Sequence, residues 1–558
     1  MVENTQAQAI AAGQNNASVS GQNNTSVAEQ NNAFNVLDMN NYKIEKLPKM
    51  QKSGFEKWMA IFGGPLAAIA FIYIYWFAQI PFLDHLNFAG LKDAALARYD
   101  VLGAAKFVRA NYAMLAVFTA AIILWVTEPI PNYLTSLLVI LGIVLTHVTT
   151  DKVAYAQLGH PVMWLNILSF VLASMLVKTQ VAKRLALWLV VKFGKSTTML
   201  VVCFLVLNLI LSTIITATTA KAAILLPVFM VICAIYGDTG GDKRTNFGRN
   251  MVLQNLFQNN VSASGFLTGS GANLLAASLI AGAMGMDMFS YTEWFAAGFP
   301  LAIILLILGL LIGTKIIFPL KPEDRKPKIP GGMAYLKAQL DAMGKMSFQE
   351  YKAIGIFVIV ILLWTTGKQT HISETAVAFI GALVALMPGI GIVKWNEVDI
   401  PWHLMLFSAG AYTLGAGLDA TGLPVTVVDA SFDAMGITTH TPFWAIYMIM
   451  TGIMLFSALI FESKTMRALI FIPIAIGVAQ KFGYPIMSLA FPVALLIEHV
   501  YVLPFNSKPA ALLYTTNHYS WGDTFKFGMT MMIVSWIMIM VWGDTMLRWL
   551  GYTNGVFF

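Results

Sequence analysis

Charged residues are scarce in this chain. Of its 558 residues, 11% are charged and 58% are hydrophobic, whereas roughly a quarter of the residues of an ordinary soluble domain are charged. Uncharged runs such as residues 58–80 and 300–314 recur as far as Trp542, and they approach or exceed the roughly 20 residues that a helix needs to cross a bilayer. The composition excludes a soluble protein and predicts a polytopic membrane protein.

The length of these runs also excludes a transmembrane barrel, because its strands are much shorter and alternate between polar and apolar residues. Inside a bilayer every backbone polar group needs a partner, and a helix supplies those partners within its own segment. We therefore expect an all-α polytopic membrane protein with about 11 transmembrane helices.

Two further absences narrow the function. The sequence has no His-Glu-x-x-His motif and no clear nucleophile pair, which disfavours an enzyme. Its two cysteines, Cys203 and Cys233, stand in apolar surroundings, where a packed thiol is favoured over a disulfide or a metal ligand. No cofactor is expected.

The N-terminal 42 residues are rich in Asn, Gln, Ser and Ala, and they lack the basic and apolar regions of a signal peptide. We expect residues 1–42 to form a disordered polar tail.

The net charge of +7 comes from basic clusters beside apolar runs, which is the positive-inside pattern and not a sign of nucleic-acid binding. One cluster contains Lys43, Lys46, Lys49, Lys52 and Lys57, and another contains Lys315, Lys321, Arg325, Lys326 and Lys328. The pattern predicts a protein of the cell (inner) membrane with a cytoplasmic N-terminus.

Similar segments occur twice. LASMLVKTQ at 172–180 aligns with LGAGLDATG at 414–422, and ATTAKAAILLP at 217–227 aligns with SKTMRALIFIP at 463–473. Transporters are often built from two such halves, with the binding site between them. We expect two inverted-topology repeats, residues 43–328 and 329–558, after the tail.

The second alignment places Lys221 on Arg467. Lys221 is the one charged residue between residues 196 and 237, and no Asp, Glu, Lys or Arg occurs at 434–461. A charge at membrane depth is unfavourable unless it is paired or hydrated, so the default interpretation is a substrate or ion site. For Lys221 the alternative is a side chain that reaches the membrane surface from a helix end.

Hydroxyl residues surround both cations and suggest that the helices are interrupted there. Each following half-helix would direct its free N–H groups at a ligand, which favours an anion. The candidate substrate-binding residues at the two tips are Thr218, Thr219, Lys221, Ser463, Lys464, Thr465 and Arg467. Arg467 is expected to bind a carboxylate with both arms of its guanidinium group.

A second polar segment follows each tip. In the first half it is SASGFLTGSGANLLAAS at 262–278, which includes Asn273, with packing of small residues as the alternative. In the second half LPFNSKPAALLYTT at 503–516 predicts a broken helix around Asn506, Ser507 and a buried Lys508.

Three further residues are candidates for ion or proton coupling: Glu462, Glu498 and His499. For Glu462 the alternative is pairing with a basic group of the site. For His499 packing, or pairing with Glu498, is favoured over a proton relay.

From about residue 55 onward the chain resembles the divalent anion:sodium symporter family of di- and tricarboxylate carriers. The resemblance rests on ILWVTEPIPNYLTSLLVILG, SMLVKTQVAKRLALWLV and DIPWHLMLFSAGAYTLGAGLDATGL. It implies two re-entrant hairpins with Ser-Asn-Thr tips, two unwound segments, elevator-type alternating access and a homodimer in the lipid bilayer.

Both tip asparagines of the family are replaced, by Thr218 and Lys464. An ammonium group at Lys464 would repel a nearby cation, which argues against bound sodium; Gly269 and Ser270 would hold it if it is present. Sodium-independent exchangers of the family carry a basic residue two places after the tip triplet, where Lys221 and Arg467 stand.

The sequence therefore predicts a secondary transporter of di- or tricarboxylate anions, working as a sodium-independent exchanger. Three fixed cations make an empty site unfavourable to move across the membrane, so return with a second anion is favoured. The alternatives are sodium- or proton-coupled symport of carboxylate or sulfate, and an anion channel.

Overall fold

The computed structural model describes residues 35–43, 54–86, 88, 91, 93–286, 289–435, 441–461, 463–504 and 506–557. Throughout these residues the secondary structure is helical, which confirms the all-α prediction. Glu462 lies outside the described residues.

The elements of the first half follow the short η1 (Met39–Tyr42). They are α2 (Gly54–Ile72), η3 (Tyr73–Phe77), α3 (Pro81–Asp84), α4 (Asp93–Thr127), α5 (Asn132–Leu145), α6 (Asp151–Ala156), η5 (Gln157–Gly159), α7 (Pro161–Thr179), α8 (Val181–Phe193), α9 (Thr197–Ser212), α10 (Thr218–Ile235), η6 (Gly241–Lys243), α11 (Asn246–Ser264), η7 (Leu267–Gly269), α12 (Gly271–Ala283), α13 (Tyr291–Leu311) and η8 (Ile312–Ile317).

Two elements, η9 (Pro322–Arg325) and α14 (Gly332–Ala342), lead into the second half. Its elements are α15 (Phe348–Thr365), α16 (Gly367–Thr370), α17 (Glu374–Leu386), η10 (Trp395–Glu397), α18 (Trp402–Thr421), α19 (Leu423–Met435), α20 (Phe443–Phe456), η11 (Ser457–Leu459), α21 (Lys464–Phe482), α22 (Ile486–Leu495), α23 (Lys508–Tyr514), α24 (Trp521–Asp544) and α25 (Met546–Trp549).

The order of elements is the same in both halves, as two repeats require. A long helix (α7, α18) is followed directly by a shorter one (α8, α19), then by a helical hairpin (α9 with α10, α20 with α21). An interrupted helix (α11 and α12, α22 and α23) and a long helix (α13, α24) complete each half.

Among the described residues, eight helices are long and apolar enough to cross a membrane. The sequence predicts about 11 spans, and much of the difference lies in six shorter apolar helices of 10–17 residues. Four of these six belong to the hairpins and interrupted helices, where a turn or an unwound segment divides one apolar run into two short helices.

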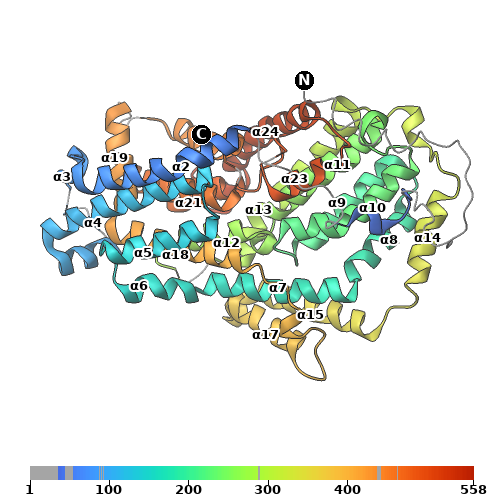
Figure 1. Cartoon of the computed structure of the whole chain (residues 1–558), viewed down its shortest axis with the longest axis horizontal. Helices are drawn as coiled ribbons and strands as arrows, with labels where there is room; N and C mark the ends of the chain where they lie inside the picture. Colours follow the sequence, from blue (N-terminus) through green and yellow to red (C-terminus); the bar gives the residue numbers. More distant parts are fainter. Residues whose placement is uncertain are drawn as a thin grey trace, which may run out of the picture. The chain divides into compact units, whose positions relative to one another are not determined.

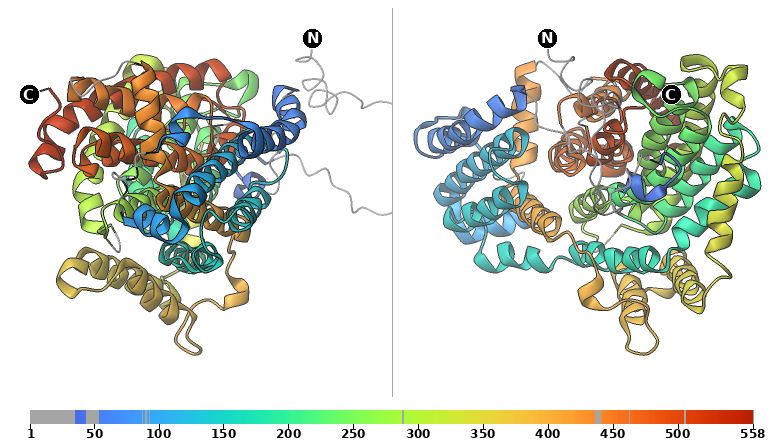
Figure 2. Two further views of the ribbon diagram at one scale, coloured as in Figure 1. Left: turned by 90° about the vertical axis from the view of Figure 1, so that its left-hand side faces the viewer. Right: turned by 45° about the vertical axis from the view of Figure 1, so that its right-hand side comes forward.

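The helices form two groups of neighbours. In Figure 1, α4, α5 and α18 lie side by side, and each of the three packs against the other two. The hairpins and interrupted helices pack on one another instead, with α21 against α12 and α22, and with α11 against α9 and α10. Figure 2 shows α15 and α17 paired. All the described candidate site residues lie in the second group.

The last part of the predicted polar tail is folded. Residues 35–42 are described, and Met39 and Tyr42 of η1 are buried. This element packs on α10. The remaining residues of the predicted tail lie outside the described part of the chain.

A nearly buried ion pair joins α8 to α15. Arg184 Nε donates to Glu350 Oε1 over 2.5 Å, and Arg184 also donates to the main-chain carbonyls of Met343 and Gly344 over 3.0 and 2.8 Å. The side chains of Arg184 and Glu350 are 15% and 4% exposed. The pair fixes the amphipathic helix α8, which leads into the first hairpin.

We expect Arg184→Ala to destabilise the protein by about 3 kcal/mol, because the charge of Glu350 loses its partner. The measurement is thermal unfolding in detergent. A matched control is Lys178→Ala, whose partner Glu397 lies in an exposed pair with side chains 46% and 43% exposed, so its effect should stay below roughly 1 kcal/mol. Equal melting temperatures for the two variants would contradict this prediction.

Candidate functional site

The two hairpin tips meet in the structure. The first tip comprises residues 213–219, from the turn after α9 into the first turn of α10, and the second comprises Ser463, Lys464 and Thr465 at the start of α21. Lys464 Nζ on the second tip is 3.4 Å from Thr218 Oγ1 on the first, although 246 residues separate them. Segments that are far apart in the sequence therefore lie together at this candidate site.

The Lys464 ammonium group is the centre of a polar cluster. It donates to Asn260 Oδ1 on α11 over 2.7 Å and to Glu498 Oε2 over 2.5 Å. The Lys464 side chain is 11% exposed, whereas the Glu498 side chain is fully buried. A buried charge pair of this kind needs further hydrogen bonds, and Asn260 and Thr218 supply them.

Glu498 lies in the non-helical segment 496–507 between α22 and α23. Its second carboxylate oxygen accepts a hydrogen bond from Ser270 Oγ over 2.5 Å. Ser270 caps α12 and lies in the corresponding interruption of the first half. One carboxylate thus joins the interrupted helices of both repeats.

Lys221 is fully buried and its ammonium group is bound by the protein. It donates to Ser212 Oγ at the end of α9 over 2.7 Å and to the carbonyl of Asn259 on α11 over 3.4 Å. Ser212 Oγ is also 2.8 Å from Ser262 Oγ. The alternative of a side chain that reaches the membrane surface is therefore wrong for Lys221 in this conformation.

Arg467 is also fully buried, and the structure corrects the role predicted for it. Nε donates to Ser457 Oγ over 2.9 Å, and Nη1 donates to the carbonyl of Ile497 over 2.9 Å. Nη2 donates to the carbonyls of Met454 and Leu455 at the end of α20. The guanidinium group is occupied by protein oxygens, so it does not offer both arms to a carboxylate.

Lys221 and Arg467 therefore have equivalent positions in the two halves. Each donates to a serine at the end of the hairpin's first helix and to a main-chain carbonyl of the interrupted helix that follows. Each holds a positive charge between a hairpin tip and an interrupted helix, surrounded by neutral oxygens.

The remaining tip residues are partly exposed. Ser463 caps α21 by accepting a hydrogen bond from the amide of Met466 over 3.3 Å. Ala217, at the corresponding place before α10, has no capping side chain. Thr219 and Thr465 are half-buried in the first turns of the two half-helices. These hydroxyl and amide groups can face a ligand that approaches Lys464.

Several predicted residues instead brace the interrupted helices. Asn273 Nδ2 donates to the carbonyls of Ala263 and Phe266 over 2.9 and 3.0 Å. Asn506 donates to the carbonyl of Ala458 and accepts from the amide of Leu503. The side-chain amides of Asn273 and Asn506 thus bind protein groups, and Asn273 Oδ1 is the one of their oxygens that has no hydrogen-bond partner.

Three more predicted residues lie beside the cluster or away from it. Ser507 caps α23 by accepting from the amide of Ala510 over 3.3 Å. Lys508 is exposed, so the prediction of a buried cation there is wrong. Gly269 packs against the chain, because a Cβ atom at this position would lie 2.1 Å from the carbonyl oxygen of Ala263.

His499 is fully buried, and neither of its ring nitrogens has a hydrogen-bond partner. Its ring centroid is 5.8 Å from that of Tyr501. Glu498 binds Lys464 and Ser270 instead of His499. Packing, one of the two alternatives favoured by the sequence, describes this histidine.

Sequence reasoning missed two polar partners on α11, Asn259 and Asn260; Ser262 begins the polar segment 262–278 that the sequence indicates. The signal was the run LQNLFQNNVSAS at 253–264, in which amide residues recur through a helix that is buried on all sides. A membrane helix with so many buried amides needs internal partners for them.

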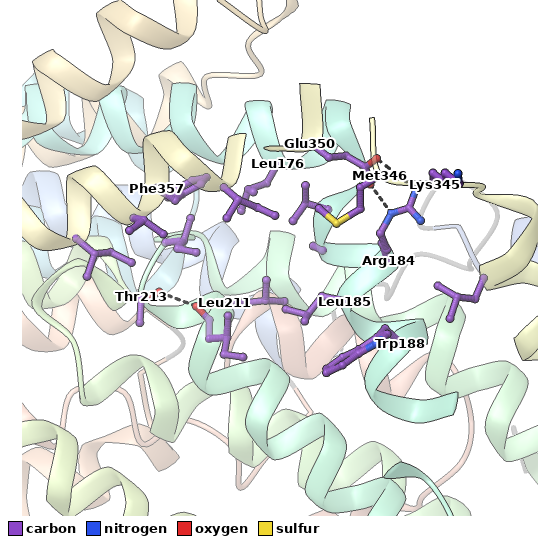
Figure 3. A pocket seen from close by; sticks show the side chains of 18 of the residues that line it. Leu176, Arg184, Leu185, Trp188, Leu211, Thr213, Lys345, Met346, Glu350 and Phe357 are labelled. Atoms are coloured by element: carbon purple, nitrogen blue, oxygen red, sulfur yellow. Dashed lines mark hydrogen bonds and ion pairs between the residues drawn. The ribbon is translucent and has the colours of Figure 1, made fainter. Parts of the chain in front are cut away.

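A cavity of about 940 Å³ lies next to this cluster but does not contain it. Figure 3 shows its lining from α8, α9, α14 and α15, with Arg184 and Glu350 at one end. Leu211 and Thr213, which flank Ser212, reach it from the first hairpin. Lys221, Lys464, Arg467 and Glu498 do not line this cavity.

Comparison with known proteins identifies the family. The family model described as the sodium:sulfate symporter transmembrane region matches residues 104–553, which is most of the chain. The protein belongs to the divalent anion:sodium symporter family. It is therefore a multi-pass membrane protein of a transporter family.

Individual relatives of this family member are distant. A sodium-dependent dicarboxylate transporter, SdcS, of Staphylococcus saprophyticus is 26% identical over 451 residues, covering 76% of this chain and 85% of the relative. A membrane protein of Cupriavidus necator is 23% identical over 465 residues, covering 79% and 88%. The YdaH transporter of Alcanivorax borkumensis matches with a TM-score of 0.45 and 12% identity over 89% of this chain and 98% of that one.

The position of Arg467 generates a prediction about stability. We expect Arg467→Gln to lower the melting temperature in detergent by about 2 °C, roughly what a loss of 2–3 kcal/mol would cause in a chain of this size. The reason is that carbonyl oxygens at the ends of α20 and α22 lose a charged donor. Lys508→Gln is the matched control, since Lys508 is exposed, and its melting temperature should not change.

Proposed function

We propose that this protein is a secondary active transporter of dicarboxylate anions that works as an exchanger and does not depend on sodium. The observation that carries the proposal is the Lys464 ammonium group, which lies between the two hairpin tips with 11% of its side chain exposed. A cation at that place can bind an anion, and the uncapped start of α10 adds free amides beside it.

The charge of the cluster favours a dianion. The described side chains are three cations, Lys221, Lys464 and Arg467, and one carboxylate, Glu498, so the fixed charge is +2 when all are ionised. A bound dicarboxylate neutralises this charge, whereas a tricarboxylate leaves an excess negative charge. Sulfate has the same charge, but the relative named above as a dicarboxylate transporter favours a carboxylate.

Sodium independence is supported by the surroundings of Lys221 and Arg467. A sodium ion in a protein is held by carbonyl and hydroxyl oxygens, as other hard cations are. In both halves the oxygens between the hairpin tip and the interrupted helix are bound to a side-chain cation. We propose that these two fixed charges take the place of bound sodium in this family member.

Exchange follows from the same charges. An empty site with a fixed charge of +2 is unfavourable to move through a membrane, whereas the site loaded with a dianion is neutral. The cations cannot dissociate, so the return step is favoured when a second dianion is bound. All described charges of the site lie in the hairpins and interrupted helices, which supports movement of that group past the other helices as an elevator.

Orientation and assembly are also proposals. The main-chain amide of Lys328, in the basic segment, donates to the carbonyl of Ile235 at the C-terminal end of α10, and η1 also packs on α10. We therefore propose that the basic segment and η1 lie on one side of the membrane. The positive-inside pattern makes this side cytoplasmic, in a cell (inner) membrane. A homodimer is proposed from the family resemblance.

Sodium- or proton-coupled symport is the second candidate, because the family description and the names of the relatives contain sodium-dependent transport. It differs from the first candidate in what drives accumulation. A coupled symporter accumulates its substrate without an internal anion, and an exchanger requires one.

The transport test uses proteoliposomes that contain the purified protein and internal succinate. We expect labelled external succinate to enter in sodium-free buffer at the same rate as with sodium, and we expect little uptake into liposomes without an internal dicarboxylate. Malate, 2-oxoglutarate, citrate and sulfate as internal anions define specificity. Uptake that requires sodium and no internal anion would favour the symporter.

The role of Lys464 is tested in the same assay. We expect Lys464→Gln to raise the KM for succinate roughly 30-fold or more, because a buried charge contact to the substrate is lost. Lys508→Gln removes an exposed positive charge in the same half and should leave the KM unchanged. If both variants had the wild-type KM, Lys464 would not bind the substrate.

A further inference from the structure

Lys464 has no donor left for a substrate in the structure. An ammonium group has three N–H bonds, and its three partners here are Glu498, Asn260 and Thr218. The strongest of these partners is the Glu498 carboxylate, since an ionised acceptor binds more strongly than a neutral one. A substrate carboxylate that binds Lys464 must therefore take the place of one partner.

Glu498 is the partner whose chemistry matches that of the proposed substrate. It presents a carboxylate to Lys464 from a non-helical segment, and Ser270 from the other repeat holds its second oxygen. Asn260 and Thr218 are neutral and lie on α11 and α10, which are regular helices. If a substrate carboxylate replaces Glu498, Lys464 keeps a carboxylate partner and its contacts with Asn260 and Thr218. Replacing either neutral partner would disturb a regular helix.

We propose that Glu498 is a tethered carboxylate that occupies, in the empty carrier, the place that one carboxylate of the substrate takes in the loaded carrier. This inference rests on the proposed function and adds a specificity-determining residue to it. Substrate binding is then a competition between Glu498 and the substrate for Lys464.

The freed carboxylate keeps favourable neighbours. Ser270 Oγ remains a donor to it, and Arg467 binds the carbonyl of Ile497, the residue directly before Glu498. A positive charge is thus fixed beside the segment that carries Glu498. The ring of His499, which follows Glu498, makes no hydrogen bond to a neighbouring element, and the main-chain amide of this residue donates within the same segment, to the carbonyl of Leu496 over 3.2 Å.

The competition has two consequences for transport. Glu498 weakens substrate binding, because Lys464 must exchange an internal carboxylate for an external one. Glu498 also lowers the charge of the empty site from +3 to +2 and so makes the return of the empty carrier less unfavourable. The residue therefore sets how strictly the carrier depends on exchange.

The test compares wild type with Glu498→Gln in proteoliposomes, with labelled succinate as the probe. We expect the KM of Glu498→Gln for external succinate in exchange to fall on the order of tenfold, the effect of removing one close competing charge. We also expect the efflux of labelled succinate from loaded Glu498→Gln proteoliposomes into succinate-free buffer to fall relative to the exchange rate. The reason is that the empty carrier of this variant has a higher charge. Glu498→Asp keeps the charge and should resemble wild type.

Glu374→Gln is the matched control, because it removes another buried carboxylate, one that accepts from the amide of Tyr291 outside the cluster. Its KM should be that of wild type. If Glu498→Gln does not fold, the double variant Lys464→Gln/Glu498→Gln removes both charges of the pair together. It should then be recovered in folded form, with a KM as high as that of Lys464→Gln.

The outcomes separate this inference from the proposed function. If wild type exchanges succinate but Glu498→Gln keeps its KM and its ratio of efflux to exchange, Glu498 does not compete with substrate and the inference is wrong. If a pH gradient drives wild-type uptake and Glu498→Gln loses only this effect, Glu498 carries a proton instead. If wild type shows no succinate exchange, the proposed function itself fails.

Discussion

An ionised side chain in the interior of a membrane protein is stable only where protein groups replace the water that it has lost. The candidate site of this family member follows that constraint at every charge described. Lys221 and Arg467 are surrounded by serine hydroxyls and main-chain carbonyls, and Lys464 binds a carboxylate and two neutral oxygens. The arrangement of both hairpins and both interrupted helices depends on these contacts, because each cation joins elements that are separate in sequence.

The interrupted helices provide the oxygens for this purpose. A regular helix uses its carbonyl groups internally, but a helix end leaves several of them without a partner. Arg467 binds carbonyls at the ends of α20 and α22, and in the first half Lys221 binds the serine that ends α9. Irregular backbone in the membrane interior therefore supplies hydrogen-bond acceptors to these cations, and the cations in turn stabilise the irregular backbone.

Much of this could be predicted from local sequence. Apolar runs predict membrane helices, and isolated Lys221 and Arg467 in aligned positions predict a site built from two repeats. The role of each cation could not be predicted in the same way. Arg467 suggests a bidentate carboxylate ligand on chemical grounds, yet its donors are used by Ser457 and by carbonyls up to 30 residues away. Every residue has a main-chain carbonyl, whatever its side chain. The sequence therefore does not distinguish a cation that binds substrate from one that binds the backbone.

The sequence by itself determined the class of the protein, the presence of two similar halves and the positions where charge enters apolar segments, because these depend on composition and on spacing along one chain. Only the tertiary structure decided which charges meet. Lys464 contacts Thr218 on α10, Asn260 on α11 and Glu498 in the segment between α22 and α23. Lys508 is exposed, although its sequence surroundings resemble those of a buried cation. Partners in a membrane interior are chosen by packing of distant segments, since each charge must find the nearest group that can replace water.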